Sequence, residues 1–325
     1  MDILITGITG RIGANLAAAL TRRGHRVRGL VWPRDSRIEK LRDLKVELQR
    51  GSLTEAGDVE QAVEGMEVVF HLGGAFQGGG PFTDEEFFEI NVRGTFNVLE
   101  AARSNGEIKQ LLFASTDALF EKYPPQGMQD PITEAMPRSP QGWYALSKSM
   151  GEEMCNSYWR GYGLPITILR FAMVCGAGEI LDFSQFYLSK LRTTYGELEP
   201  LWKGEEQLVL LRDSKGRYFK KHIADVRDIV HGCLCALGRE RALGETFQLA
   251  GPRPFTWDEA VYRLAEILDL PLVDIQVSGT PTFYEFDLSK AQTALGFQPS
   301  CDIVRMIVDA LSFRRGEDIG VLLTG

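Results

Sequence analysis

The sequence predicts an α/β fold in which helices cover both faces of a parallel sheet. Short apolar runs alternate with helical patterns through the first half of the chain, beginning at residues 2–6 (DILIT). Such alternation places a crossover helix between neighbouring parallel strands. The 325 residues, 44% hydrophobic and 25% charged, suit one large domain or two interlocked domains.

The elements follow one another in the order that this fold requires. Strands are expected over residues 2–6, 26–31, 45–51, 67–72, 108–114, 165–171 and 246–251. Helices are expected over residues 11–24, 36–43, 55–63, 143–161, 256–270 and 287–297, and in the second part of 221–238. Another helix opens at Thr83, because Glu86 three residues later completes a capping-box pattern. Thr256 is an expected N-cap, residues 174–180 resemble a loop, and residues 183–220 form a mixed segment.

The regular alternation fades after residue 171 and indicates two parts. Residues 1–171 together with 221–250 are expected to form the sheet domain. Residues 172–220 together with 251–325 are expected to form a smaller α/β lobe over the carboxyl edge of the sheet. A cleft at that edge is where open α/β sheets bind ligands.

Composition argues against several classes of function. The formal net charge of −8 argues against nucleic acid and against an anionic membrane surface. No apolar run approaches the roughly 20 residues that span a bilayer, and the N-terminus lacks the pattern of a signal peptide. The five cysteines are dispersed and the four histidines form no ligand-spaced cluster, so we expect reduced thiols, no metal and a cytoplasmic location.

A glycine-rich turn connects the first strand to the first helix. The stretch TGITGRIG places Gly7, Gly10 and Gly13 between them, with Arg11 and Ile12 at the helix start. These glycines suit a tight turn, close approach to a pyrophosphate and close helix–strand packing, while the helix N-terminus offers N–H groups. The sequence therefore predicts a Rossmann-type doubly wound sheet that binds a dinucleotide.

The end of the second strand bears on which dinucleotide binds. Val31 and Trp32 stand where an acid usually accepts the ribose hydroxyls, and Arg28 and Arg34 lie nearby. Without the acid, a 2′-phosphate is not repelled, and an arginine can pair with it. This favours NADP over NAD, although both arginines could equally be solvated surface residues.

Tyr144 and Lys148 form an i, i+4 pair on one helical face, in a helix that follows the strand ending near Thr116. Hydride transfer at a carbinol carbon requires a proton to move at its oxygen. A neighbouring ammonium lowers the pKa of a phenol, which makes Tyr144 the candidate acid/base. Lys148 would also hold the nicotinamide ribose, and the Thr116 hydroxyl would orient the substrate oxygen.

At this point the sequence resembles the extended short-chain dehydrogenase/reductases, the epimerase/dehydratase branch. Nine blocks match in the expected order between residue 2 and about residue 300: TGITGRIG, VVFHLGG, INVRGTFNVLEAA, LLFASTDALF, YALSK, LRFAMVCGAG, ADVRDIV, ETFQLAG and DLSKAQTALGF. The resemblance implies an NAD(P)-dependent enzyme. It also implies a homodimer formed through the helices that carry Asn91 and Tyr144.

The resemblance assigns further positions to the cofactor. They are Leu53, Leu72, Gly73, Gly74, Asn91, Ser115, Phe171 and Met173, together with Ser52, which stands where the family has an acid. Enzymes of the branch that remove water carry a glutamate where Ala118 stands. Because a methyl group cannot take a proton, Ala118 favours redox chemistry or epimerisation over dehydration.

Three departures from the family bear on the substrate. Met173 replaces an asparagine, Lys221 replaces an arginine, and residues 276–286 lack the usual phosphate-binding arginine. These changes favour a carbohydrate-like substrate without a nucleotide, with Thr116, Asp117, Met173, Lys221 and His222 as candidate contacts. Arg212, Arg217 or Lys220 could restore phosphate binding, which leaves a nucleotide-sugar epimerase or reductase as an alternative. A second alternative is a non-catalytic redox sensor that binds the dinucleotide.

Overall fold

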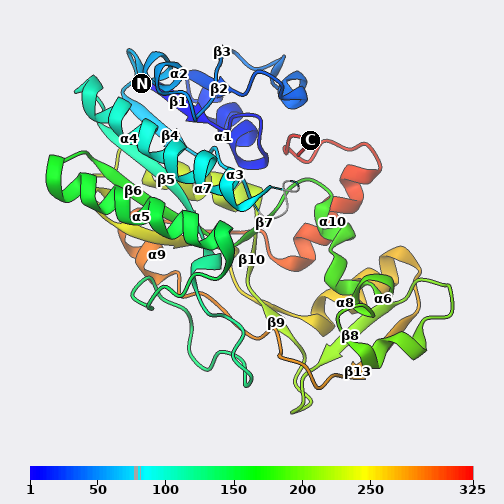
Figure 1. The fold of residues 1–325 in the computed structure, drawn as a ribbon. Coiled ribbons are helices and arrows are strands. Elements are labelled where there is room, and N and C mark those ends of the chain that lie inside the picture. Colours follow the sequence, from blue (N-terminus) through cyan, green and yellow to red (C-terminus); the bar gives the residue numbers. More distant parts are fainter. Residues whose placement is uncertain (77–79, 81, 325) are drawn as a thin grey trace.

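The computed structural model describes residues 1–76, 80 and 82–324 (Figure 1). A seven-stranded parallel sheet lies at its centre, with strand order β11-β6-β5-β4-β1-β2-β3. The strands are β1 (Asp2–Thr6), β2 (Arg26–Val31), β3 (Val46–Arg50), β4 (Val68–His71), β5 (Gln110–Thr116), β6 (Ile166–Phe171) and β11 (Thr246–Leu249). The predicted α/β fold is confirmed. All seven strands expected from the sequence lie in this sheet.

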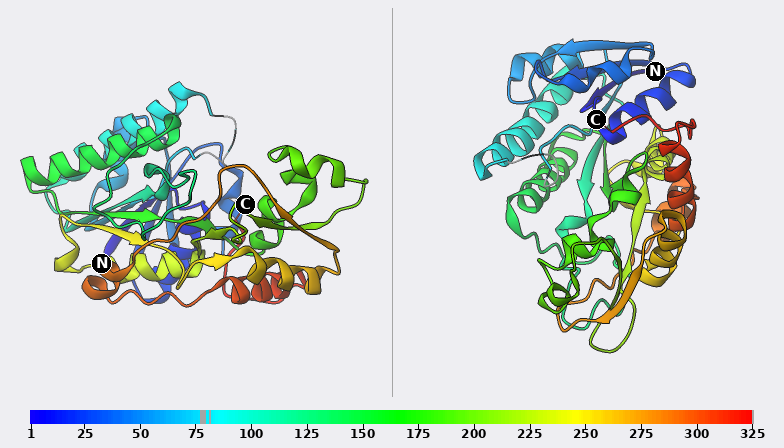
Figure 2. Two further views of the ribbon diagram at one scale, coloured as in Figure 1. Left: turned by 90° about the horizontal axis from the view of Figure 1, so that it is seen from below. Right: turned by 90° about the vertical axis from the view of Figure 1, so that its right-hand side faces the viewer.

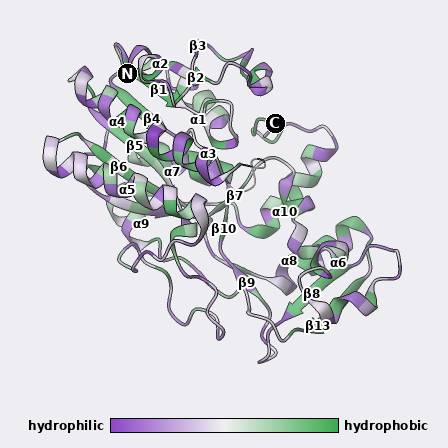
Figure 3. Cartoon of the chain, in the orientation of Figure 1, coloured by the Kyte–Doolittle hydropathy of each residue, from purple (hydrophilic) through white to green (hydrophobic). Residues whose placement is uncertain are grey.

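Helices cover both faces of the sheet (Figure 2). On one face, α1 (Arg11–Arg22), α7 (Val226–Ala236) and α9 (Ser289–Leu295) pack on an apolar core. On the other face lie α2 (Ala56–Val63), α4 (Gly94–Asn105) and α5 (Gly142–Tyr162). The inner strands β1, β4, β5 and β6 are buried almost throughout because helices cover both of their faces, whereas the edge strand β3 is partly exposed. Figure 3 shows this as green strands beneath helices that are partly purple.

The approach to α4 follows the predicted capping box. The Thr83 hydroxyl accepts from the Glu86 N–H, and the Glu86 carboxylate accepts from the Thr83 N–H, which opens α3 (Asp84–Phe87). A π-helical turn, Phe88–Arg93, continues directly into α4. The turn places Asn91 on the buried side, next to the loop that follows β4.

The smaller lobe has its own apolar core, and fewer of its elements were predicted from the sequence. Its parallel pair β8 (Leu208–Arg212) and β13 (Leu272–Gln276) packs with α6 (Leu188–Leu191), α8 (Trp257–Leu268) and α10 (Ile303–Arg314). Neither strand of that pair was predicted, and α10 was not predicted either. Residues 174 and 175, expected as part of a loop, belong to β7 (Met173–Cys175), which lies beside β10 (Ile223–Asp225).

Two details of the C-terminal third differ from expectation. Thr256 does stand at the N-cap of α8, but its side chain makes no cap hydrogen bond. Its backbone instead pairs β12 (Phe255–Thr256) with β9 (Lys220–Lys221). The proposed division places 251–325 in the lobe, whereas Ala291 and Leu295 of α9 are buried in the core of the sheet.

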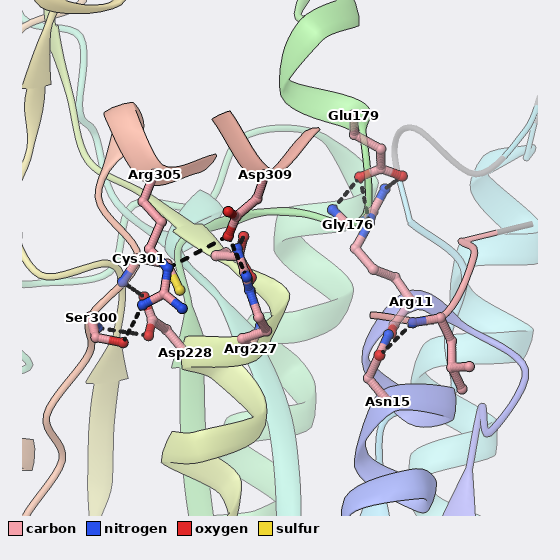
Figure 4. Close-up of polar contacts among 12 residues, drawn as sticks. Arg11, Asn15, Gly176, Glu179, Arg227, Asp228, Ser300, Cys301, Arg305 and Asp309 are labelled. Carbon is pink, nitrogen blue, oxygen red and sulfur yellow. Dashed lines mark hydrogen bonds and ion pairs between the residues drawn. The ribbon is translucent and has the colours of Figure 1, made fainter. Parts of the chain in front are cut away.

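Charged groups connect the lobe to the sheet domain (Figure 4). Arg227, in α7, donates to Asp309 of α10 at 2.6 Å. The Asp228 carboxylate accepts from the backbone N–H groups of Ser300 and Cys301 at 2.8 and 3.0 Å. These contacts fix α10 against the sheet domain and so position the lobe over the carboxyl edge of the sheet.

Two kinds of feature, a membrane-spanning helix and a metal-binding cluster, are absent from the described residues. None of the helices in the described ranges is long and apolar enough to cross a membrane. Within those same ranges, no three His, Cys, Asp or Glu side chains gather in a way that could hold a metal ion.

Candidate active site

A cavity of about 1390 Å³ lies along the carboxyl edge of the sheet, reaching from the glycine loop to the lobe. It exceeds the roughly 300–1,000 Å³ of an ordinary small-molecule site, so it has room for a dinucleotide and a substrate together. Most of the predicted site residues line it, namely Gly7, Gly10, Arg11, Ile12, Gly13, Trp32, Arg34, Ser52, Leu53, Leu72, Gly73, Gly74, Ser115, Thr116, Asp117, Tyr144, Lys148, Phe171, Met173 and Lys221. Asn91 and His222 are not among the lining residues.

The glycine loop has the geometry of a phosphate cradle. Gly7 has φ +71°, and a Cβ on Gly13 would lie only 2.2 Å from the Gly7 carbonyl oxygen. Gly10 is the N-cap of α1 and has no side chain to cap the helix, so the first N–H groups of the helix can donate to an anion. The loop therefore fits the pyrophosphate of a dinucleotide.

Arg11 takes part in holding the two parts of the chain together. Its guanidinium donates to Glu179 Oε1 at 2.8 Å, and the other Glu179 oxygen accepts from the Gly176 N–H (Figure 4). The glycine loop is thereby linked to the turn that begins the lobe segment. This partner for Arg11 could not be read from the sequence.

The two arginines in and just after β2, Arg28 and Arg34, differ in their contacts. Arg34 lines the cavity, whereas Arg28 is not among the lining residues, because it pairs with Glu47 and donates to two carbonyl oxygens near α2. Asp35 also lines the cavity. Burial opposes its ionisation, but hydrogen bonds from Arg37 and Thr9 hold the pKa of Asp35 well below its usual range.

Thr116 and Tyr144 come together from different elements. Thr116 ends β5 and Tyr144 lies in the first turn of α5. Burial raises the pKa of Tyr144, the donor of the neighbouring Thr116 hydroxyl lowers it, and the Asp117 carboxylate raises it again. The two hydroxyls are thus placed to bind the same substrate oxygen.

Lys148 lies one turn after Tyr144 and is buried. Its ammonium donates to the Ala114 carbonyl oxygen at 2.8 Å. Burial lowers the pKa of Lys148 to about 8. This contact fixes the side chain beside β5, where it lines the cavity between the glycine loop and Tyr144.

Two of the predicted residues support the cavity wall from behind. Asn91 bridges the Ala75 backbone and the Ser147 hydroxyl, which joins the loop after β4 to α5. Ser115 donates to Glu152 at 2.6 Å. Glu152 is buried in α5 and accepts a forked pair of hydrogen bonds from Arg170 at 2.8 and 2.7 Å. The sequence alone did not single out Glu152 or Arg170, because their pairing joins distant segments.

The substrate end of the cavity holds several charged side chains. Asp117 accepts from Lys122 at 2.6 Å, and Lys221 donates to Gln185 at 2.9 Å. Met173 contributes its thioether to the same wall. Lys122 was missed at the sequence level, because nothing in the loop EKYPPQG marks it as buried.

His222 does not reach the cavity. Its Nε2 donates to the Gly251 carbonyl oxygen at 2.9 Å, and its Nδ1 accepts from the Phe286 N–H at 3.1 Å. Both ring nitrogens are therefore used in joining backbone segments. Burial lowers the pKa of His222 to about 4, so the ring is neutral at pH 7.

We expect this burial to make stability fall in mild acid. The unfolded chain binds a proton near the ordinary pKa of about 6.5, but folded His222 resists protonation down to about pH 4. The contribution of His222 to stability is therefore fully present above pH 6.5 and is lost at up to ~1.4 kcal/mol per pH unit between pH 6.5 and about pH 4. The buried His71, whose pKa burial lowers to about 3, adds a loss of the same sign. Urea unfolding between pH 7.5 and 4.5 measures this. His222→Gln should flatten the slope, and an unchanged slope would contradict the account.

Comparisons with known proteins identify the family of the chain. The model of the NAD dependent epimerase/dehydratase family matches residues 3–250. A crystal structure of a short-chain dehydrogenase/reductase superfamily protein from Agrobacterium tumefaciens with bound NAD is 31% identical, covering 97% of this chain and 98% of that one, with a TM-score of 0.84.

Two curated relatives match over nearly the whole chain. An uncharacterised UDP-glucose epimerase of Bacillus subtilis is 26% identical over 96% of this chain and 98% of its own length. UDP-glucuronate 4-epimerase 3 of Arabidopsis thaliana is 26% identical over 93% of this chain and 74% of its own length. With the glycine loop, Thr116, Tyr144 and Lys148 in place, the chain belongs to the NAD dependent epimerase/dehydratase family.

Proposed function

We propose that the protein is a nucleotide-sugar epimerase that uses a nicotinamide dinucleotide. The observation that carries this proposal is the single cavity with a phosphate cradle at one end and Thr116 with Tyr144 at the other. The sequence alone favoured a substrate without a nucleotide. The relatives instead support a nucleotide-sugar substrate, because their names describe epimerases of UDP-sugars.

The lobe offers polar and aromatic groups that suit part of a nucleotide handle. A second cavity, of about 170 Å³, is lined by Gln185, Lys190, Tyr195 and Trp257 among others. Gln185 also accepts from Lys221, which lines the main cavity, so one hydrogen-bonded pair has a member in the lining of each space. An ammonium and aromatic rings suit a phosphate and a nucleobase, which supplies what residues 276–286 lack.

In the proposed mechanism, Thr116 donates or accepts a hydrogen bond at the sugar oxygen and fixes its position. Tyr144 removes the proton from that hydroxyl and later returns it. Lys148 holds its charge behind this pair and favours the phenolate. A bound nicotinamide dinucleotide would supply the acceptor and donor of the hydride. Ala118 contributes no base, so these residues perform no elimination of water.

We also propose a preference for NADP over NAD. Fewer arginines support this preference in the structure than in the sequence. Arg28 is engaged elsewhere, which leaves Arg34 as the free-standing candidate on the cavity wall. The Agrobacterium tumefaciens structure carries NAD. If NADP is preferred here, Arg34→Ala should weaken NADP binding without weakening NAD binding, as titration calorimetry would measure.

We also propose a cytoplasmic homodimer formed through α4 and α5. Phe96 of α4 and Leu146 of α5 are exposed, as are the aromatic rings of Trp143, Trp159 and Tyr162 on α5. Large apolar side chains gathered on two neighbouring helices suit a self-association surface. Light scattering at micromolar concentration should give twice the chain mass.

The proposed function is tested with matched sugars. Purified protein is incubated with UDP-glucose, UDP-glucuronate and the corresponding free sugars, and the products are identified by NMR. We expect C4 epimers of the UDP-sugars only. Turnover of the free sugars alone would instead indicate a substrate that lacks a nucleotide. Cofactor binding with no turnover of any sugar would support a non-catalytic redox sensor.

A further inference from the structure

We propose that the substrate sugar carries a carboxylate next to the reacting carbon, and that Lys122 and Lys221 hold it. This inference rests on the proposed function and names the class of sugar on which the same site acts. It comes from three features of the substrate end of the main cavity. These are a buried ammonium beside the catalytic pair, an uncompensated second ammonium and an unpaired tyrosine hydroxyl.

The first feature is Lys122. It is only 6% exposed, although it lies in a loop, and its ammonium contacts Asp117 Oδ2 at 2.6 Å. It also lies 5.0 Å from the centre of the Tyr284 ring. Lysine is rarely buried without a charged partner, and this one lines the cavity beside the residue that follows Thr116. The ammonium is therefore held within reach of the sugar.

The second feature is the local balance of charge. Lys122 and Lys221 contribute two ammonium groups, and Asp117 is the carboxylate that pairs with one of them. Lys221 is 5% exposed and donates to the neutral Gln185, and no carboxylate in the described ranges forms an ion pair with it. Burial, and then the charge of Lys122, lower the pKa of Lys221 to about 8, while Asp117 raises it. An anionic ligand group would supply the missing charge.

The third feature is the Tyr284 hydroxyl. Tyr284 lines the cavity and is 1% exposed. Although Tyr123 packs edge-on to its ring, the hydroxyl makes no well-formed hydrogen bond within the part of the chain that the structure describes. A buried hydroxyl without a partner is costly unless a ligand atom supplies one. Its donor would complete an oxyanion site with the two lysines.

The position of this cluster identifies which acidic group it fits. Asp117 directly follows Thr116, and Lys122, which pairs with Asp117, lines the same cavity as Thr116 and Tyr144, so its ammonium lies on the side of the cavity where the reacting oxygen would bind. In a hexopyranose that reacts at C4, the substituent on C5 is adjacent to that oxygen. The diphosphate of a nucleotide sugar is attached at C1, across the ring. The anion that meets Lys122 is therefore a carboxylate on C5, as in a hexuronic acid.

The experiment compares UDP-glucuronate with UDP-glucose, which differ only in the group on C5. We expect the wild type to show kcat/KM at least tenfold higher for the acid. Removing Lys122 alone would leave Asp117 buried without its partner, so the test uses the double variant Asp117→Asn/Lys122→Met. Its acid-to-neutral ratio should fall toward 1, as should that of Lys221→Met. Lys220→Met is the matched control, because Lys220 pairs with Glu285 outside the cavity lining, and its ratio should equal that of the wild type.

The outcomes separate this inference from the proposed function. A wild-type ratio near 1, or a high ratio that survives in the double variant, would overturn the inference while leaving epimerisation intact. If neither UDP-sugar is turned over, the proposed function fails, and binding decides the inference. Thermal shift with glucuronate and glucose, in the presence of NAD, should then favour the acid in the wild type and in Lys220→Met but not in the double variant. Equal shifts would overturn it. Unchanged NAD affinity shows that each variant is folded.

Discussion

Tyr144→Phe is expected to lower kcat by on the order of 10²–10⁴-fold while leaving the affinity for the dinucleotide unchanged. The substitution removes one oxygen from a ring that packs near Phe87, so its volume and packing are kept. What is lost is the group that takes the proton from the sugar hydroxyl. Steady-state turnover and cofactor titration on the same preparation measure the two quantities separately.

A second variant sharpens this prediction. Thr116 lowers the pKa of Tyr144, so Thr116→Val should raise that pKa and move the activity profile to higher pH. Tyr158→Phe is the matched control, because Tyr158 is on the same helix but donates to Glu100, away from the cavity. Full activity of Tyr144→Phe would show that the acid/base assignment is wrong.

Glu152→Gln is expected to lower the free energy of unfolding by about 3–5 kcal/mol. Its carboxylate is 1% exposed at the side chain and binds the equally buried Arg170 through two hydrogen bonds. The same carboxylate accepts from Ser115 and Arg138. Removing the negative charge leaves the Arg170 guanidinium buried without compensation, and urea unfolding at pH 7 measures the loss.

The neighbouring Glu153 provides the control for this measurement. It forms ion pairs with Arg138 and Arg160, but more than half of its side chain is exposed. Exposed ion pairs contribute little, so Glu153→Gln should change stability by less than about 1 kcal/mol. If the two substitutions cost the same, the buried network does not hold β5 against α5 as described.

Candidate-site residues whose relation is local in the sequence could be predicted to lie together. Gly7, Gly10 and Gly13 have fixed spacing between a strand and a helix, and Tyr144 and Lys148 are one helical turn apart. Each of these relations depends on a few consecutive residues. The structure places all five around one cavity, together with Thr116 at the end of β5.

The parts that depend on distant segments could not be predicted. Lys122 is buried only because Asp117 and the ring of Tyr284 meet it, and Glu152 is satisfied by Arg170 from another strand. His222 was expected at the substrate, but its two nitrogens join Gly251 and Phe286. In the same way, β8 pairs with β13 although Leu208 and its partner Leu272 are 64 positions apart in the sequence (272 − 208).

Epimerisation in D₂O, with NAD supplied in excess over the sugar, tests the central claim most directly. If Tyr144 and Thr116 serve a hydride that leaves and returns at one carbon, a UDP-hexuronic acid should give its C4 epimer. The epimer should retain protium at C4, and absorbance at 340 nm should not accumulate in proportion to product. Stoichiometric growth of that absorbance, or deuterium at C4 of the product, would contradict the account.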